Sequence, residues 1–225
     1  MKPIRTKAIV LRRTNYAEAD RILQLLTPEY GKMSVIAKGV RREKSKLAGG
    51  IELFAVCDVS VIPGKGDMGT LTSSRLDTFY AHILEEYDRL QFGYEAIKQI
   101  SKAAEEVSEP AFFELLKGAF VSLDDPEISE KITETWFWLQ LAILLGVGFN
   151  LSTDDNGMKL VDQSRYNFSE DSMALTYSEQ GRFTTEHIKL LRLLSAQPPA
   201  VARQVRGIDD LISDCLWLAE RTVAH

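Results

Sequence analysis

The chain has 225 residues, 45% hydrophobic and 26% charged, with a formal net charge of −5 at pH 7. This length allows two modest domains with a substantial core. The most apolar segment, residues 136–149, is shorter than a run of about 18 residues that would indicate a membrane span, so we predict a buried helix there. Cys57 and Cys215 form no disulfide or ligand pattern, and the N-terminus lacks a signal-peptide core. We therefore expect a cytoplasmic globular protein.

Charge is unevenly distributed along the chain. Residues 1–80 carry 14 Lys+Arg against 8 Asp+Glu, whereas residues 81–225 carry 13 against 24. The net charges are therefore +6 and −11. An asymmetry of this kind indicates nucleic-acid contact by the first part only.

The first 80 residues have the composition and spacing of five short strands. Aliphatic and β-branched runs alternate with segments rich in Gly, Pro, Asn and Asp. The predicted strands are residues 6–13, 21–26, 32–38, 54–62 and 70–76. One long polar insertion follows the third strand, which favours a small Greek-key barrel of the OB type. An SH3-like barrel remains open from the pattern alone.

Residues 81–225 are predicted to form a helical domain, so the fold class is α+β. Apolar residues recur at helical spacing from Leu84 to Ala104, and Gly93 is expected to divide this stretch into two helices. Further helices are predicted up to Leu145, over 184–195 and over 208–222. Between them, residues 150–182 lose the helical period and predict a small hairpin or irregular excursion.

The segment 38–50 is the strongest functional signal. Five cations fall within nine residues beside three glycines and one acid, and they are Lys38, Arg41, Arg42, Lys44 and Lys46. These charges repel one another, so their concentration indicates a polyanionic partner.

Other basic and aromatic residues extend this signal over the predicted barrel. The cations on or beside strands are Lys7, Arg12, Arg13, Arg21 and Lys32. Single-stranded nucleic acid binds to basic grooves by phosphate neutralisation and by stacking of bases on aromatic rings. Tyr16 and Tyr30 lie in polar turns and are candidate stacking residues, whereas Phe54 between Leu53 and Ala55 is predicted to be in the core.

Motifs of catalysis and cofactor binding are missing. Residues 64–69 match G-x-G-x-x-G, but a strand is predicted to follow them, whereas the dinucleotide motif requires a helix. The sequence has no Walker A, GxSxG or HExxH motif, and its three histidines are scattered. We therefore predict no enzyme activity, no catalytic residue, no cofactor and no metal.

The N-terminal motifs resemble those of the RecO family of bacterial recombination mediators. The residues that carry the resemblance are Tyr16-Ala17-Glu18-Ala19-Asp20-Arg21-Ile22, Tyr30-Gly31-Lys32 and Lys38-Gly39-Val40-Arg41-Arg42, with Ser45, Gly49 and Phe54. In that family an OB domain precedes a helical domain, which a small excursion interrupts after an LLGxG-like helix end, here Leu144–Gly148. The resemblance implies an OB domain over residues 1–80 and a helical domain over 81–225.

The resemblance also implies a function and partners. Such a protein binds single- and double-stranded DNA, anneals complementary strands and works with RecR, and often RecF, to load RecA onto strands covered by single-strand-binding protein (SSB). It would be associated with the bacterial nucleoid. Many RecO proteins hold zinc in the excursion with four cysteines, but residues 150–182 contain no cysteine. The sequence therefore predicts a turn-rich hairpin in place of the zinc site.

Two further expectations concern protein partners. The acidic, hydrophobic-ended tail of SSB docks on the helical domain in some RecO proteins, and such a tail needs local cations. Lys189, Arg192, Arg203 and Arg206 are the predicted patch. The alternative function is an adaptor whose helical domain is the main interaction surface and whose barrel docks a protein rather than DNA.

Overall fold

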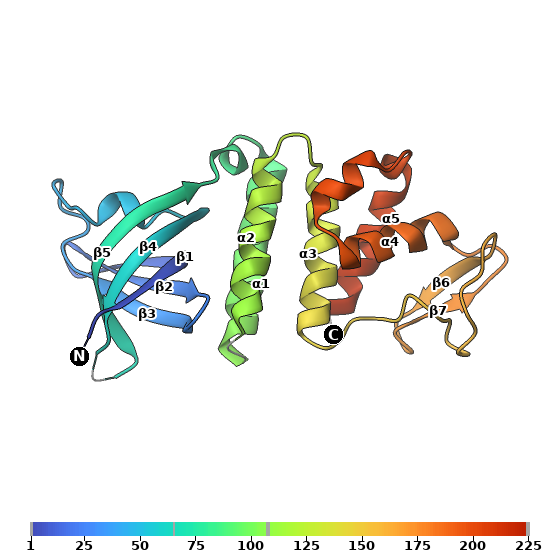
Figure 1. Ribbon diagram of the computed structural model, residues 1–225, viewed down its shortest axis with the longest axis horizontal. Coiled ribbons are helices and arrows are strands. Elements are labelled where there is room, and N and C mark those ends of the chain that lie inside the picture. The colour runs from blue at the N-terminus through green and yellow to red at the C-terminus, as the bar shows by residue number, and fades with distance from the viewer. Residues whose placement is uncertain (1, 65, 107–108, 224–225) are drawn as a thin grey trace. The chain divides into compact units, whose positions relative to one another are not determined.

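The structure, a computed structural model, describes residues 2–64, 66–106 and 109–223 (Figure 1). The chain divides into two compact units, Met1–Asp124 and Asp125–His225. The predicted boundary after residue 80 follows the last strand of the first unit. Two helices beyond this boundary belong to the same unit as the strands. The assignment of separate roles to residues 1–80 and 81–225 stays a prediction.

A closed five-stranded barrel forms the first part of unit 1, which confirms the predicted OB-type fold. Its strands are β1 (Ile4–Tyr16), β2 (Asp20–Thr27), β3 (Gly31–Ala37), β4 (Ala55–Ile62) and β5 (Met68–Phe79). They pair in the order β1-β2-β3-β5-β4, and β4 closes the barrel on β1. All pairs are antiparallel except β3 with β5.

Alternation along the strands builds the barrel core. Ala8 and Val10 on β1 and Leu23 and Leu25 on β2 occupy alternate positions and belong to the barrel core, although the residues between and beside them, such as Ile9 and Leu26, are buried as well. Lys7, just before Ala8, is exposed on the outer side of β1. Arg12 is exposed as well, because a bulge at Leu11 shifts the register of β1 by one residue. The same alternation that fills the core therefore carries cations to the outside.

Helix α1 (Tyr87–Glu106) is continuous, so the predicted break at Gly93 is wrong. A Cβ at Gly93 would lie 2.8 Å from Cε1 of Phe54 and 3.3 Å from Cγ2 of Ile83. The glycine thus serves close packing of α1 on the barrel end rather than termination of the helix. Phe54 is 1% exposed, as predicted, and its ring also contacts Phe120 of α2 (Pro110–Asp124).

Unit 2 contains three helices and a small sheet. The helices are α3 (Glu130–Leu144), α4 (Thr185–Ala196) and α5 (Ile208–Val223), and α3 packs mainly on α5. The excursion contains β6 (Arg165–Ser169) and β7 (Ala174–Tyr177), paired as a hairpin and joined by β8 (Phe183–Thr184). The predicted hairpin is confirmed. Among the described helices none is long and apolar enough to cross a membrane.

Short 3₁₀ turns complete the two units. They are Ala48–Gly50 before β4, Ala81–Leu84 between β5 and α1, and Pro199–Gln204 between α4 and α5. The first of these follows the cation-rich segment and returns the chain to the barrel.

Candidate nucleic-acid interface

The basic loop, residues 38–46, joins β3 to the turn before β4 and is anchored on the β1–β2 turn. The backbone N–H of Gly39, where φ is +64°, donates to Oδ1 of Asp20 at 2.7 Å. The Arg41 backbone N–H donates to the carbonyl of Ala19 at 2.9 Å, and its guanidinium donates to the carbonyl of Glu18 at 3.1 Å. These bonds fix the path of the loop against the barrel end.

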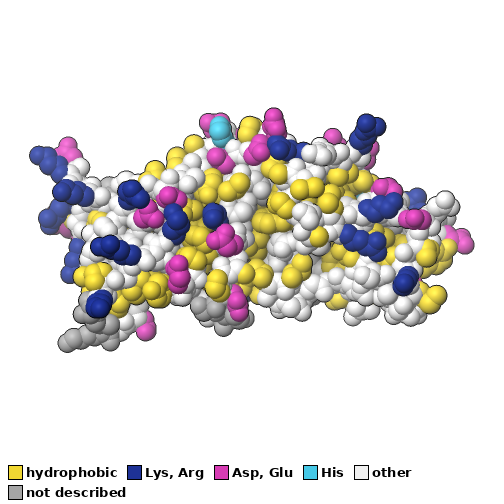
Figure 2. Space-filling model, viewed as in Figure 1, with side chains coloured by type: hydrophobic (Ala, Val, Ile, Leu, Met, Phe, Trp, Pro, Cys, Tyr) yellow, Lys and Arg dark blue, Asp and Glu magenta, His cyan; other side chains and the backbone are white. Residues whose placement is uncertain are grey.

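All five loop cations are exposed to solvent: Lys38, Arg41, Arg42, Lys44 and Lys46. None of these side chains forms an ion pair with another residue that the structure describes. Figure 2 shows Lys and Arg gathered where this loop projects, at the left end of the view. Because their charges are not neutralised internally, they remain available to phosphates.

Tyr16 and Arg21 lie beside the anchored loop. Tyr16 pairs across the hairpin with Asp20, the residue that accepts the Gly39 bond, and its side chain is 52% exposed. Nε of Arg21 donates to Oδ1 of Asn15 at 3.2 Å. The basic end of the barrel, residues 15–21 with 38–46, therefore combines unpaired cations with one exposed aromatic ring.

Tyr30 lies apart from this group. It is 49% exposed in the β2–β3 turn, next to the pair Thr27 and Gly31, whereas the basic loop leaves the opposite end of β3. Seven residues of strand separate the two ends, about 23 Å at 3.3 Å per residue. The structure does not bring Tyr30 together with Tyr16.

Several predicted strand cations are already engaged inside unit 1. Nη1 of Arg13 lies 2.8 Å from Oε2 of Glu52. Nζ of Lys32 lies 2.6 Å from Oε1 of Glu105 and donates to Ser101 of α1, which leaves the lysine side chain 13% exposed. Arg12 differs, because it is exposed opposite Gln24 and has no ion pair within the described chain. Of these three residues, Arg12 is the one best placed to meet a ligand.

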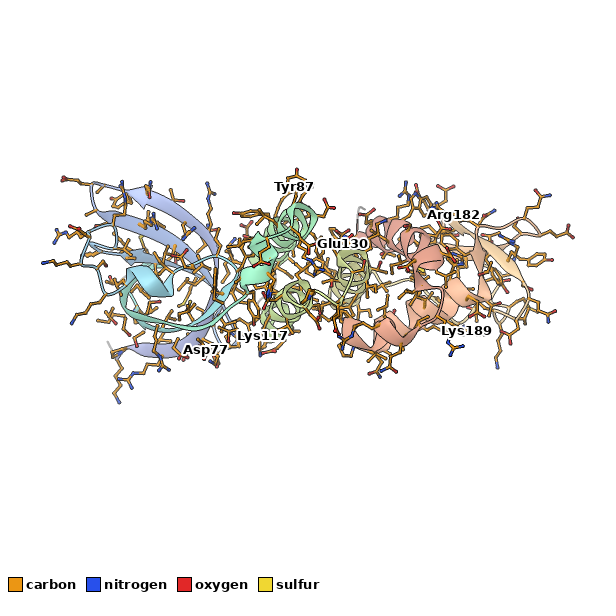
Figure 3. All side chains as sticks on the ribbon, turned by 90° about the horizontal axis from the view of Figure 1, so that it is seen from above. Asp77, Tyr87, Lys117, Glu130, Arg182 and Lys189 are labelled. Carbon is orange, nitrogen blue, oxygen red and sulfur yellow. The ribbon has the colours of Figure 1, made fainter. Side chains whose placement is uncertain are left out.

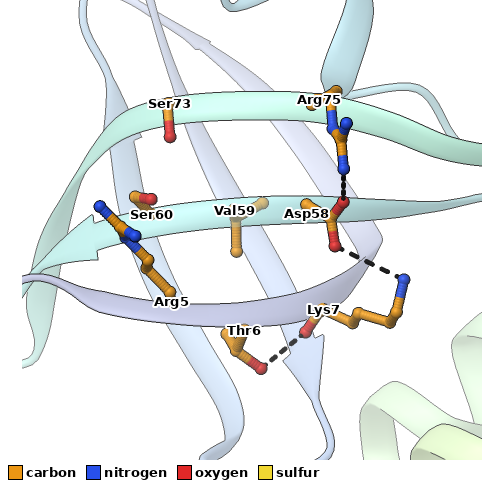
Figure 4. Close-up of a pocket in the computed structure, with 8 residues that line it drawn as sticks. All are labelled: Arg5, Thr6, Lys7, Asp58, Val59, Ser60, Ser73 and Arg75. Carbon is orange, nitrogen blue, oxygen red and sulfur yellow. Dashed lines mark hydrogen bonds and ion pairs between the residues drawn. The ribbon is translucent and has the colours of Figure 1, made fainter.

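Lys7 belongs to a hollow of about 610 Å³ on the β1–β4–β5 face (Figure 4). Asp58 there lies 2.7 Å from Nη2 of Arg75 and 3.4 Å from Nζ of Lys7, which also lies 2.8 Å from Asp77. The hydrogen bond from Arg75 lowers the pKa of Asp58, and the bond to Asp77 raises the pKa of Lys7. Carboxylates thus offset much of the positive charge on this face.

The predicted patch in unit 2 is only partly assembled. Lys189 and Arg206 both line a groove of about 320 Å³ with apolar residues such as Leu193. Glu186 and Asp210 line the same groove, and Nζ of Lys189 lies 3.1 Å from Oε1 of Glu186. Arg192 instead donates from Nε to the carbonyl of Leu151 at 2.9 Å. Arg203 lies 2.6 Å from Oε2 of Glu127 and 3.3 Å from Oδ2 of Asp125. Of the four cations, the structure therefore brings only Lys189 and Arg206 together, which sequence spacing could not show.

The cysteines are poor candidates for nucleophiles or metal ligands. Both are buried and free, and desolvation raises the pKa of Cys57 to about 11 and that of Cys215 to about 12. Such thiols stay protonated and unreactive at neutral pH. In the part of the chain that the structure describes, no three His, Cys, Asp or Glu side chains gather in a way that could hold a metal ion.

Comparison with known proteins places the barrel in a family. The family model described as "Recombination protein O N terminal" matches residues 1–79. A DNA repair protein RecO of Dehalococcoides mccartyi strain CBDB1 is 37% identical over 134 residues, 58% of this chain and 53% of that protein. The same-named protein of D. mccartyi strain ATCC BAA-2266 / KCTC 15142 / 195 is 35% identical over 143 residues, 63% of this chain and 56% of that protein.

The chain thus spans about half the length of the curated relatives that it matches. The matched segment contains every barrel strand and the basic loop. The resemblance predicted from the motifs at 16–22, 30–32 and 38–42 is confirmed. The first 79 residues match the model of the RecO N-terminal domain, and the chain is similar to bacterial DNA repair proteins named RecO.

Proposed function

We propose that this chain is a non-enzymatic DNA-binding protein of recombinational repair. The observation that carries the proposal is the basic end of the barrel, where five exposed cations that form no ion pair with a described residue lie on a loop anchored beside Tyr16. Phosphate neutralisation by such a surface is independent of sequence and acts on single and double strands. The names of the relatives support a role in DNA repair.

Strand annealing follows from the same electrostatics. Two complementary strands repel each other, and neutralising both on one basic surface removes the repulsion that opposes their pairing. The chain would need no nucleotide hydrolysis for this step. We extend the proposal to a mediator that helps to load RecA onto SSB-coated strands, with RecR and, in some settings, RecF as partners, because residues 1–79 match the model of the RecO N-terminal domain.

The test is an annealing assay with two complementary labelled oligonucleotides, with and without SSB, in the absence of ATP. The full chain should accelerate annealing, and an Arg41→Glu/Arg42→Glu variant with an unchanged melting temperature should not. Annealing at the spontaneous rate with the wild-type chain would refute this function.

A second candidate is an adaptor that docks a protein on unit 2. The observation in its favour is the groove between α4 and α5, where Leu190, Leu193 and Leu211 lie beside Lys189 and Arg206. An acidic peptide with an apolar end, such as the tail of SSB, would contact the leucines and Arg206 and would compete with Glu186 for Lys189, which lies 3.1 Å from it.

Peptide titration tests the groove. A labelled SSB-tail peptide should bind to the wild type and bind several-fold more weakly to a Lys189→Ala/Arg206→Ala variant. The matched control is Arg203→Ala, because Arg203 does not line the groove and is held by Asp125 and Glu127. Equal weakening by the control would remove the groove as the site, and absence of binding to the wild type would remove the tail as its ligand.

A further inference from the structure

A second positively charged feature of unit 1 lies outside the basic loop, in a groove of about 430 Å³ between the barrel and α1. Its barrel wall carries Arg12 and Gln24, which pair across β1 and β2. Its helix wall carries Tyr94, Lys98 and Lys102. These three residues are spaced four apart, so they form one line along the helix surface.

Tyr94 offers a ring that is held in place and still accessible. Its ring centroid lies 5.0 Å from that of Phe54 at an interplanar angle of 73°, and Phe54 is anchored in the core. The Tyr94 side chain is nevertheless 49% exposed. A fixed aromatic surface at the mouth of a basic groove is the element on which an unpaired base stacks.

The charges around the ring favour an anion. Lys102 and Arg12 are exposed and have no ion pair among the residues described, whereas Lys98 lies 3.1 Å from Glu95. Among the described residues that line the groove the one acid is Glu105, whose hydrogen bond with Lys32 at 2.6 Å lowers the pKa of its carboxyl. Lys32, a predicted DNA contact, thus acts here by neutralising the acid that would repel a phosphate.

The groove is also continuous with the basic end of the barrel. Arg12, Thr14 and Tyr16 are all exposed at alternate positions of β1 and therefore share its outer face. Four residues of strand span about 13 Å. A strand bound at the basic loop can follow this face into the groove without leaving the surface of unit 1.

We propose that the α1 groove is a subsite for single-stranded DNA, in which one unpaired base stacks on Tyr94 and the flanking phosphates contact Arg12 and Lys102. This inference rests on the proposed DNA binding and extends it past residue 80, into a part of the chain whose net negative charge predicted avoidance of DNA. Stacking requires an unpaired base, so the subsite selects single strands over duplex, whereas the basic loop serves both.

The experiment measures the affinity of the full chain for labelled oligo(dT) and for a blunt duplex by fluorescence anisotropy. Tyr94→Leu, which keeps an apolar side chain against Phe54, should weaken oligo(dT) binding by about 5- to 100-fold, the usual effect of one lost stacking contact. Tyr94→Phe should bind normally, and duplex affinity should be unchanged in both variants. Lys102→Gln should flatten the log-affinity against log-salt slope for oligo(dT) by about 0.7.

Two control variants match these changes elsewhere in unit 1. Tyr87 begins α1 and is 75% exposed, and Lys117 lies on α2; both are labelled in Figure 3. Tyr87→Leu and Lys117→Gln should leave both affinities unchanged. Losses equal to those of Tyr94→Leu and Lys102→Gln would show a general effect of surface change and overturn the subsite.

The basic-loop variant distinguishes failure of the subsite from failure of the proposed function. If Arg41→Glu/Arg42→Glu abolishes binding and Tyr94→Leu changes nothing, the subsite is wrong and the function stands. Equal loss for oligo(dT) and duplex in Tyr94→Leu would also overturn stacking. No DNA binding by the wild type would overturn both proposals.

A crosslink to the wild type avoids reliance on variant stability. Oligo(dT) that carries 5-iododeoxyuridine should crosslink on irradiation to an aromatic ring in contact with the base, and peptide mapping should recover Tyr94. Adducts confined to Tyr16 or Tyr30 would place the bases elsewhere and refute the subsite.

Discussion

The basic loop and the second unit both contain clustered cations, but their surroundings differ. Lys38, Arg41 and Arg42 are exposed and have no carboxylate partner within the described residues. Arg182 of unit 2 instead lies 2.9 Å from Asp214, and its guanidinium lies 4.4 Å from the centroid of Trp217. Cations without a nearby carboxylate or aromatic ring are therefore available to bind a polyanion, whereas cations that contact such groups stabilise the fold.

Reversal of the loop charges should have the largest effect of any surface change. A variant with Arg41, Arg42, Lys44 and Lys46 all replaced by Glu should lose on the order of 100- to 1000-fold in affinity for single strands at low salt, and its salt slope should flatten by about 3. Titration of labelled oligonucleotides over a salt series measures both quantities.

The control for this prediction is a charge reversal in unit 2 at Lys189 and Arg206, the groove cations. These changes should leave the salt slope unchanged. If the folded loop variant keeps the affinity for single strands and the salt slope of the wild type, the DNA site does not include the basic loop.

The Arg182 side chain should matter for stability instead. Arg182→Gln removes the contact with Asp214 and the stacking over Trp217, which Arg221 also approaches at 3.8 Å. Because Arg182 and Asp214 are 40% and 30% exposed, solvent screens the ion pair. The free energy of unfolding should fall by about 1 kcal/mol, with DNA affinity unchanged. Chemical denaturation measures the first quantity, and a weaker DNA complex would contradict the assignment.

The sequence only partly predicts which cations are free to bind a polyanion and which are paired within the fold. Strand alternation and the 3.6-residue period predicted the barrel, the hairpin excursion and the helices, because these patterns are local. The density of charge at 38–46 likewise marked the loop. Lys32 and Arg203 were predicted as contacts, yet their partners Glu105 and Glu127 lie 73 and 76 residues away in the chain. Ion pairs between such distant segments leave no local pattern.

Gly93 and Tyr94 show the same limit. The sequence indicated a helix break at Gly93, but the glycine allows Phe54 to approach α1, and this packing fixes the adjacent Tyr94. The contact with Phe54 thus determines the packing role of Gly93 and the orientation of Tyr94, and the helical pattern of residues 87–106 shows neither. Sequence reasoning therefore did not identify the α1 groove.

A pH-dependent stability of unit 2 is a smaller effect. His187 is buried, its Nδ1 accepts the backbone N–H of Thr184 at 3.2 Å, and Nε2 lies 3.5 Å from Oδ2 of Asp214. Desolvation lowers the pKa of His187 below its usual 6.5, although Asp214 opposes the shift and Arg165 and Arg182 add to it. The unfolded chain therefore binds more protons below pH 6.5, so stability should fall as the pH drops from 6.5 towards the folded-state pKa.

Thermal unfolding between pH 7.5 and 5.5 tests this dependence. The melting temperature of the wild type should decrease over this range, and His187→Gln should flatten the decrease. The same slope in both proteins would assign the dependence to other groups.

Metal removal should have no effect on the stability of unit 2. The excursion, residues 150–182, for which the RecO resemblance implied either four zinc-ligating cysteines or a hairpin, is closed by hydrogen bonds and apolar contacts. Oδ1 of Asp154 accepts the backbone N–H groups of Asn156 and Met158 at 3.0 and 2.8 Å. Tyr166 is buried, its hydroxyl accepts the N–H of Val161, and Leu175 is 0% exposed. A structural zinc would contribute directly to folding, so a chain that folds without zinc should have a melting temperature that is independent of chelator. Elemental analysis of the purified chain should find negligible zinc, and EDTA should leave the melting curve unchanged. Stoichiometric zinc, lost together with thermal stability on chelation, would contradict this account and require oxygen or histidine ligands in place of the missing cysteines.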